Sequence, residues 1–340
     1  MRLRLTLCLV VTFIINCLGY NEPQRPITFK NVRICLISQV FKSNLTVFVS
    51  EARNLRDFII SNKTDTIRIN NQEIPMLYER SVTDIPNVAV FDLSSNGIQG
   101  IEEGAFGNLG FVQALNLSSN LIRVVRSEVF THVDVRFLFL AHNRIFQIEE
   151  GAFNHLDHLY FIDLSYNRIR NWSWRWFRGT PFKGINMRHN LLENLPEDSF
   201  RFIDDLELPH DQKIFHHLLF GHNSIKSVDK YSLPRLKKII HFDLSHNKLE
   251  TIEVGTFNNV ESLDNIDLSN NLLTYLDRNV FKFTEVGYVN LKANYLVSID
   301  AEFIPMVNLD LNPLVGHTKK RWMEWRNKYG YALESPQYSS

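Results

Sequence analysis

The chain has 340 residues, of which 44% are hydrophobic and 22% are charged, so it contains ample apolar material for a globular core. Its 37 basic and 37 acidic residues cancel. No global basic field therefore indicates a nucleic acid or an anionic membrane as the partner.

The first segment has the layout of a secretory signal peptide. A basic head, Met1–Arg4, precedes an apolar run, Leu5–Leu18, and the small residue Gly19. A membrane anchor is the alternative, but the run is shorter than the roughly 20 residues that a span needs. We expect residues 1–19 to be cleaved. No later segment is apolar enough to span a membrane, so we expect a secreted, extracellular product.

Glycosylation signals and cysteine usage agree with that route. The sequons begin at Asn44, Asn62, Asn116 and Asn171, and each is a candidate glycan site. Cys8 and Cys17 fall in the signal peptide, which leaves Cys35 alone in the mature chain. A lone cysteine in a secreted protein indicates either a buried thiol or an intermolecular bridge, so a dimer through Cys35, disulfide-linked or non-covalent, stays open.

A short motif recurs and ends each time in asparagine. Its first copy is Phe91-Asp92-Leu93-Ser94-Ser95-Asn96, and successive asparagines lie 23 or 24 residues apart, except for one interval of 33. The repeated residues are Asn96, Asn120, Asn143, Asn167, Asn190, Asn223, Asn247, Asn271 and Asn294. Apolar residues follow at two and five positions, and phenylalanine follows at ten in most copies. Such columns identify a repeat architecture.

The alternation before each asparagine predicts a short strand with one buried face. One copy cannot bury that face alone, but stacked copies form a parallel sheet with a continuous core. We expect each asparagine to lie in the bend after its strand and to bond the backbone of its own and adjacent repeats. The phenylalanines should stack as a spine on the far side. The predicted fold class is an α/β repeat solenoid.

The columns resemble the extracellular leucine-rich-repeat family over about residues 64 to 314. The resemblance implies a horseshoe with a concave parallel sheet and a convex side of short helical, 3-10 or irregular segments. It also implies partner binding as the usual role. The secreted leucine-rich-repeat immune proteins of insects are similar, although their cysteine-bearing caps and coiled-coil tails are missing here.

Both ends of a solenoid need caps because terminal repeats would expose the core. Residues 20–63 are the predicted N-terminal cap, with hairpin strands at Val32–Ile37 and Leu45–Val49. Residues 315–330 are the predicted C-terminal helical cap, in which Trp322 and Trp325 replace the cysteines of the family's cap. Residues 331–340 are expected to be disordered.

The interval between Asn190 and Asn223 is nine or ten residues longer than the usual repeat. The extra residues, around Asp204–Asp211, are rich in acidic side chains. It is either a tolerated surface loop or a loop that overhangs the sheet and helps to hold a ligand.

The register predicts which side chains point outward from the sheet. Most residues in the outward columns are ordinary surface residues, and Phe137, Phe139 and Phe161 are the outliers. Neighbouring strands lie about 4.8 Å apart, so the three rings should form one exposed aromatic patch. Clustered exposed aromatics anchor interfaces, unless a glycan or the cap covers them. Tyr166 is a further candidate binding residue.

Histidines also gather on the predicted face. His217 and His241 should be neighbours on adjacent strands, while His142, His189, His222 and His246 share the position before the asparagine. A metal site or a pH-sensitive surface is one interpretation. A solvent-facing ladder produced by the repeat itself is the other, and we predict no metal.

Two local features bear on where a partner binds. Asn116 lies beside the aromatic patch, and a glycan there would direct binding to the flank or to later repeats. The flanking segment Arg170–Arg178 places Trp172 in a core column but Trp174 and Trp176 outside the core, among arginines. These two rings form either a rigid cation–π structure or a protein contact site.

No motif for catalysis is found: the sequence has no Gly-rich phosphate loop, His-Glu-x-x-His or Gly-x-Ser-x-Gly. Asp163, Asp243 and Asp267 recur only because the repeat recurs. We therefore predict no enzyme and no cofactor, but a secreted module that recognises another protein in innate immunity or extracellular signalling. An extracellular-matrix or cell-adhesion component is the alternative.

Overall fold

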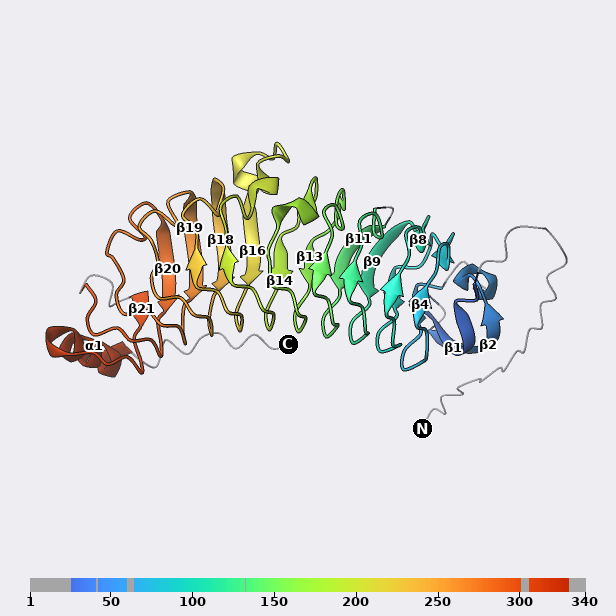
Figure 1. The fold of residues 1–340 in the computed structure, drawn as a ribbon, viewed down its shortest axis with the longest axis horizontal. Coiled ribbons are helices and arrows are strands. Elements are labelled where there is room, and N and C mark those ends of the chain that lie inside the picture. Colours follow the sequence, from blue (N-terminus) through green and yellow to red (C-terminus); the bar gives the residue numbers. More distant parts are fainter. Residues whose placement is uncertain (1–25, 41, 60–63, 132, 301–305, 330–340) are drawn as a thin grey trace. The chain divides into compact units, whose positions relative to one another are not determined.

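The computed structural model describes residues 26–40, 42–59, 64–131, 133–300 and 306–329 (Figure 1). The chain divides into two compact units: Met1–Arg168 with Arg175–Phe182, and Ile169–Trp174 with Lys183–Ser340. The predicted signal peptide, the tail at 331–340 and the sequon residue Asn62 lie outside the described residues.

The first unit carries seven strands of a sheet, followed outward from its edge as β2-β1-β3-β6-β9-β11-β13. They are β1 (Phe29–Ser38), β2 (Ser43–Ala52), β3 (Thr66–Arg68), β6 (Val90–Asp92), β9 (Phe111–Asn116), β11 (Asp134–Phe139) and β13 (Phe161–Asp163). β1 pairs antiparallel with β2 and β3, and every later pair in this unit is parallel. The hairpin strands expected at the start of the chain lie inside β1 and β2, and both are longer than expected.

Short elements complete the first unit on the side of each repeat that follows the asparagine. They are the 3-10 helix η1 (Leu55–Phe58) and the paired strands β4 (Met76–Leu77) with β7 (Gly100–Ile101), β5 (Val82–Thr83) with β8 (Phe106–Gly107), and β10 (Val124–Val125) with β12 (Gln147–Ile148). A further 3-10 helix, η2, covers Trp174–Phe177, of which Trp174 is assigned to the second unit and Arg175–Phe177 to the first.

The second unit carries the strands β14-β16-β18-β19-β20-β21 in that order, with parallel pairing throughout. They are β14 (Gly184–Asn186), β16 (Ile214–Leu219), β18 (Leu236–Asp243), β19 (Val260–Asp267), β20 (Glu285–Asn290) and β21 (Val307–Asn308). The other elements are β15 (Asn194–Leu195) paired with β17 (Ser227–Val228), the 3-10 helices η3 (Arg201–Ile203) and η4 (His210–Gln212), and the helix α1 (Gly316–Tyr329).

The asparagine column lies inside the turns and bonds backbone groups that the turns leave unpaired. The Asn120 amide donates to the carbonyls of Leu93 at 3.0 Å and Leu117 at 2.9 Å, and its oxygen accepts from the backbone nitrogens of Asn96 and Ile98. Each asparagine thus links its own repeat to the previous one. Buried peptide groups are costly without such partners, so the column keeps adjacent turns in register.

The phenylalanine column is the spine of the core. In the first unit Phe106, Phe130, Phe153 and Phe177 stack in sequence, with centroids 5.9, 5.9 and 5.3 Å apart. In the second unit Phe257 stacks on Phe281 at 5.2 Å. Offset stacking adds to the stabilisation that each ring gains by burial.

The last turn carries an additional member of the asparagine column. Asn312 donates to the carbonyl of Leu291 at 2.8 Å and accepts from the backbone nitrogen of Leu296 at 3.0 Å. It lies only 18 residues after Asn294, which hides it from a search at a period of 23 or 24. Beyond it, Trp322 of α1 is buried and stacks on Trp325 at 5.3 Å.

Candidate functional site

The three predicted phenylalanines lie together on the outer face of the first unit's sheet. Phe137 and Phe161 are register partners on β11 and β13, and the neighbours of Phe139 are Asn116 and Asp163. The rings of Phe137 and Phe139 stack with centroids 6.4 Å apart. All three side chains are half-buried, so each is held in place and still presents part of its ring to solvent.

Two residues that the outward columns did not include enlarge this patch. The ring of Tyr160 meets Phe137 edge-on at 5.8 Å. The guanidinium of Arg136 lies 5.6 Å from the Phe137 centroid and 5.5 Å from that of Tyr160. Each lies seven positions before a member of the asparagine column. Side chains at this position of the repeat also reach the outer face. We call Arg136, Phe137, Phe139, Tyr160 and Phe161 the aromatic surface.

A second aromatic cluster lies where β9 and β11 begin. Phe111, which is exposed, meets the His158 ring edge-on at 5.9 Å, and His158 Nδ1 lies 2.7 Å from Oδ1 of Asp134. Figure 1 shows β9, β11 and β13 side by side in green. Aromatic side chains therefore lie at the start and along the length of neighbouring strands.

The Asn116 side chain lies at the border of the aromatic surface, and both its amide nitrogen and its amide oxygen form hydrogen bonds. Its nitrogen donates to Oδ1 of Asp92 at 3.2 Å, and its oxygen accepts from the backbone nitrogen of Ser118 at 3.0 Å. It is half-buried, whereas Asn44 and Asn171 are exposed. Asn116 is therefore the least accessible of the described sequon asparagines.

The remaining candidates of the first unit lie apart from the aromatic surface or inside the core. Tyr166 is exposed and stacks on His142 at 4.2 Å. The expectation that Trp176 lies outside the core is wrong: its side chain is only 4% exposed and packs edge-on against Phe177. The reason is η2, whose tight turn at Trp174–Phe177 directs two successive side chains inward.

Trp172 and Trp174 belong to the second unit and have different environments. Trp172 is buried, as its core column predicts, and its indole nitrogen donates to the carbonyl of Ser199 at 2.7 Å. Trp174 is half-buried, and the Arg201 guanidinium lies 5.8 Å from its ring centroid. The cation–π contact expected for this segment thus involves Trp174 and a residue of η3.

The outer face of the second unit is rich in histidine. His217 and His241 are register partners with stacked rings 5.3 Å apart. His222 stacks on His189 at 4.2 Å and on His246 at 4.0 Å. Burial is the main cause that lowers the pKa of His217, His222 and His241 below the ordinary value. Burial thus favours the neutral form of the His217, His222 and His241 rings.

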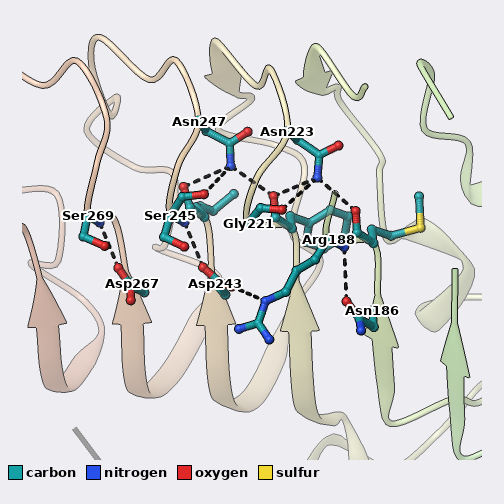
Figure 2. A network of polar contacts seen from close by, with 12 residues as sticks. Asn186, Arg188, Gly221, Asn223, Asp243, Ser245, Asn247, Asp267 and Ser269 are labelled. Carbon is teal, nitrogen blue, oxygen red and sulfur yellow. Dashed lines mark hydrogen bonds and ion pairs between the residues drawn. The ribbon is translucent and has the colours of Figure 1, made fainter. Parts of the chain in front are cut away.

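A polar network runs across the same face (Figure 2). Nε of Arg188 lies 2.5 Å from Oδ2 of Asp243, and Oδ1 of Asp243 accepts from the backbone nitrogen of Ser245 at 2.8 Å. Gly221 lies between them. A Cβ atom on Gly221 would approach Oδ2 of Asp243 to 2.6 Å, so the missing side chain makes room for this contact.

The acidic insertion is tied to strands of the second unit's sheet. His210 Nε2 lies 2.6 Å from Oε1 of Glu261, which also pairs with Lys237 at 2.7 Å. The Lys183 ammonium donates to the carbonyl of Gln212 at 2.7 Å. These contacts anchor η4 to Glu261 of β19 and to Lys183, the residue before β14, while Lys237 of β18 shares the Glu261 carboxylate.

Among the described residues, no group of three or more His, Cys, Asp or Glu side chains is arranged to hold a metal ion. Within the same residues, none of the helices is both long and apolar enough to cross a bilayer.

Cys35 is half-buried in β1, opposite Thr46 of β2 and Arg68 of β3.

The sequence matches the leucine rich repeat family over residues 86–145, 134–182, 216–273 and 241–296. These segments cover more than half of the chain, and the parallel sheets and asparagine columns are those that the repeat predicts. The chain therefore belongs to the leucine-rich-repeat family. No curated protein matches it.

Solved structures to which the chain is similar include Toll, the leucine-rich repeat domain of APL1B and TLR13. Toll in the Drosophila Toll–Spatzle complex aligns with a TM-score of 0.56 and 20% identity over 74% of this chain and 37% of that chain. The repeat domain of APL1B gives 0.49 and 18% over 71% and 73%, and TLR13 bound to ssRNA13 gives 0.42 and 18% over 78% and 52%. The chain thus spans little more than a third of the Toll chain, and the likeness shows the fold alone.

Proposed function

We propose that this chain is a secreted protein-binding module that recognises another protein through the aromatic surface of its first unit. The observation that carries the proposal is the group formed by Phe137, Phe139, Tyr160 and Phe161 around Arg136. Solvent-facing aromatics and arginine are the residue types that most often dominate binding energy in protein interfaces.

The chemistry of this surface indicates the kind of partner. The ring faces favour an apolar or aromatic side chain, and the guanidinium of Arg136 favours a carboxylate beside it. Because Phe137 and Phe139 are stacked and half-buried, little side-chain entropy remains to be lost on binding. A protein loop that presents an apolar anchor next to Asp or Glu fits both requirements.

Extracellular recognition is the setting that we propose. The N-terminal basic and apolar segment and the exposed sequon asparagines Asn44 and Asn171 support secretion. The fold is similar to that of Toll, described in complex with the protein Spatzle as a hub in development and innate immunity. That similarity supports a protein ligand and a role in innate immunity or extracellular signalling.

Affinity capture from the native fluid, with the secreted protein as bait, tests the function. A variant with Phe137→Ser, Phe139→Ser and Phe161→Ser should lose the captured partner, with affinity reduced at least about 100-fold. Its thermal unfolding should stay cooperative. The matched control is Phe146→Ser, an exposed phenylalanine of the same unit outside the aromatic surface, which should bind normally. Retained affinity in the triple variant would contradict the proposal.

A further inference from the structure

The helix α1 at the end of the second unit is strongly basic, although the charges of the whole chain cancel. Its 14 residues carry five lysine and arginine side chains and one carboxylate, that of Glu324, which leaves a net charge of +4 when His317 is neutral. Lys319 and Lys320 are exposed in its first turns. Figure 1 shows the helix in red, next to β21. None of these side chains belongs to the aromatic surface.

One side of α1 combines its lysines with exposed apolar side chains. Val315, Lys319 and Met323 follow one another at intervals of four residues, and Lys320 precedes Met323 by three, so these side chains are neighbours on the helix surface. Val315 is 59% exposed and Met323 is 53% exposed. Trp322 is buried and attaches a different side of the helix to the unit. The exposed side therefore presents both charge and apolar surface.

The exposed apolar surface continues from the helix onto the turns of the last repeats. Val297 and Val315 occupy the same position of consecutive turns, and the backbone nitrogen of Val315 donates to the carbonyl of Val297 at 3.0 Å. Leu272 and Tyr295 also share one position, in adjacent repeats. We call Leu272, Tyr295, Val297, Val315 and Met323 the apolar flank, and each of them is exposed. Single exposed apolar side chains are ordinary, but neighbouring ones indicate a contact surface.

The cations beside the apolar flank are lysines. Besides Lys319 and Lys320, the exposed Lys248 occupies the position of Leu272 in the preceding repeat. Lysine is depleted in protein interfaces, where arginine is enriched. Its ammonium is a compact charge on a flexible stem and attracts a layer of anionic headgroups without a fixed geometry. A single-stranded nucleic acid would require aromatic rings along a cationic groove, whereas most of the apolar flank is aliphatic.

We propose that α1 and the apolar flank bind the surface of an anionic lipid membrane. The ammonium groups lie at the level of the lipid phosphates, and Val297, Val315 and Met323 enter the boundary between headgroups and acyl chains. Tyr295 fits the same boundary because its ring is apolar and its hydroxyl is polar. The contact is peripheral, and its affinity combines buried apolar area with electrostatic attraction.

Sedimentation of the secreted protein with sucrose-loaded vesicles tests the proposal. One set of vesicles contains phosphatidylcholine alone, and the other contains about one third phosphatidylglycerol. In about 0.1 M salt we expect binding to the anionic vesicles to be at least about tenfold tighter, and we expect about 1 M salt to weaken it strongly. Equal binding to the two sets, or binding to neither, would overturn the proposal.

Two variants locate the contact. Lys319→Glu with Lys320→Glu should reduce the affinity for anionic vesicles at least about tenfold, because attraction is replaced by repulsion. Val315→Ser with Met323→Ser should reduce it at least about fivefold, because less apolar surface enters the membrane. All four side chains are exposed, so thermal unfolding should stay cooperative, and either variant decides the matter if the other is unfolded. Wild-type affinity in a folded variant would overturn the proposal.

A matched control carries the same change of charge elsewhere in the second unit. Lys230→Glu with Arg235→Glu alters two exposed cations before β18 and should retain most of the vesicle binding. An equal loss in this control would overturn the assignment to α1. The triple serine variant of the aromatic surface should bind vesicles as the wild type does, which keeps this proposal separate from the proposed function.

The same variants distinguish a membrane from other occupants of this surface. A glutamate-rich peptide with leucine at every fourth position should bind much more weakly than the anionic vesicles. Equal affinity for this peptide, lost in the same variants, would overturn the choice of a lipid surface. A dimer seen by sedimentation velocity without vesicles, and separated by Val315→Ser with Met323→Ser, would assign the apolar flank to a second copy and overturn the proposal.

Discussion

Arg188 and Asp243 are 55 positions apart in sequence, yet Nε of Arg188 donates to Oδ2 of Asp243 at 2.5 Å. Arg188 follows β14 and Asp243 ends β18, and β16 lies between these two strands in the sheet. The side chain crosses the intervening repeat at Gly221, where no Cβ stands in its way (Figure 2). This ion pair therefore links the first and the third of three successive repeats, whereas each residue of the asparagine column links two adjacent repeats.

Removing the arginine tests how much this contact stabilises the second unit. Arg188→Met leaves the Asp243 carboxylate, which is only 8% exposed, without its cation. Because the arginine side chain is itself 41% exposed, we expect a loss of about 1–2 kcal/mol in the free energy of unfolding, measured in urea. Arg278→Met is the control: its pair with Asp300 is long and exposed, so the loss should stay below about 0.5 kcal/mol. Equal losses of unfolding free energy in the two variants would show that the pair across Gly221 stabilises the protein no more than an exposed ion pair.

The asparagine column predicts a larger effect at single positions. Asn271→Ala removes donors to the carbonyls of Leu244 and Leu268 and the acceptor for the backbone nitrogen of Leu249, all of them buried. We expect a loss of about 2–3 kcal/mol in unfolding free energy, because the buried nitrogen of Leu249 loses its acceptor while each carbonyl keeps only one amide donor, from Asn247 or Asn294. Asn194→Ala, at an exposed position of β15, should change stability by less than about 0.5 kcal/mol. A small loss of unfolding free energy in Asn271→Ala would mean that water replaces the hydrogen bonds of the asparagine side chain.

Stability should fall in mild acid. The pKa values of His216, His217, His222 and His241 lie below the ordinary value in the folded state, so the unfolded chain binds more protons. The stability they contribute is present above the unfolded pKa of about 6.5 and is lost as pH falls through their lowered folded values. Thermal midpoints measured downward from about pH 7.5 should show this decline, and His217→Gln with His241→Gln should flatten it. A flat wild-type profile across that range would contradict the prediction.

Glycan occupancy should differ among the sequons. Asn44 and Asn171 are exposed, whereas the Asn116 amide is half-buried and bonded to Asp92 and the backbone of Ser118. Glycopeptide mass spectrometry of the secreted protein should therefore find glycans on Asn44 and Asn171 and an unmodified Asn116. A glycan on Asn116 would border Phe139 and would make binding through the aromatic surface untenable.

The fold could be predicted from the sequence because each repeat supports the same inference separately. The apolar, asparagine and phenylalanine columns recur through the chain, so one physical rule applies in every repeat. Exceptions to the period were harder to foresee. Asn312 follows a shortened repeat, and the inward turn of Trp176 depends on the local 3-10 geometry of η2.

The surfaces were only partly predictable for a different reason. Phe137, Phe139 and Phe161 stand out as aromatic outliers in the outward columns, and the strand register brings them together. Tyr160 and Arg136 belong to a column one position earlier, whose outward direction emerges only from the paired strands. The contact between Arg188 and Asp243 depends on side-chain reach across two strand spacings, which periodicity alone does not specify.

Hydroxyl-radical footprinting of the chain, alone and with its captured partner, tests recognition through the aromatic surface most directly, because it reports the solvent accessibility of individual aromatic side chains. Oxidation of Phe137, Phe139, Tyr160 and Phe161 should fall several-fold in the complex, while the exposed Phe146 should be oxidised equally in both samples. Unchanged oxidation of the four rings, with protection elsewhere on the chain, would contradict the proposed binding surface.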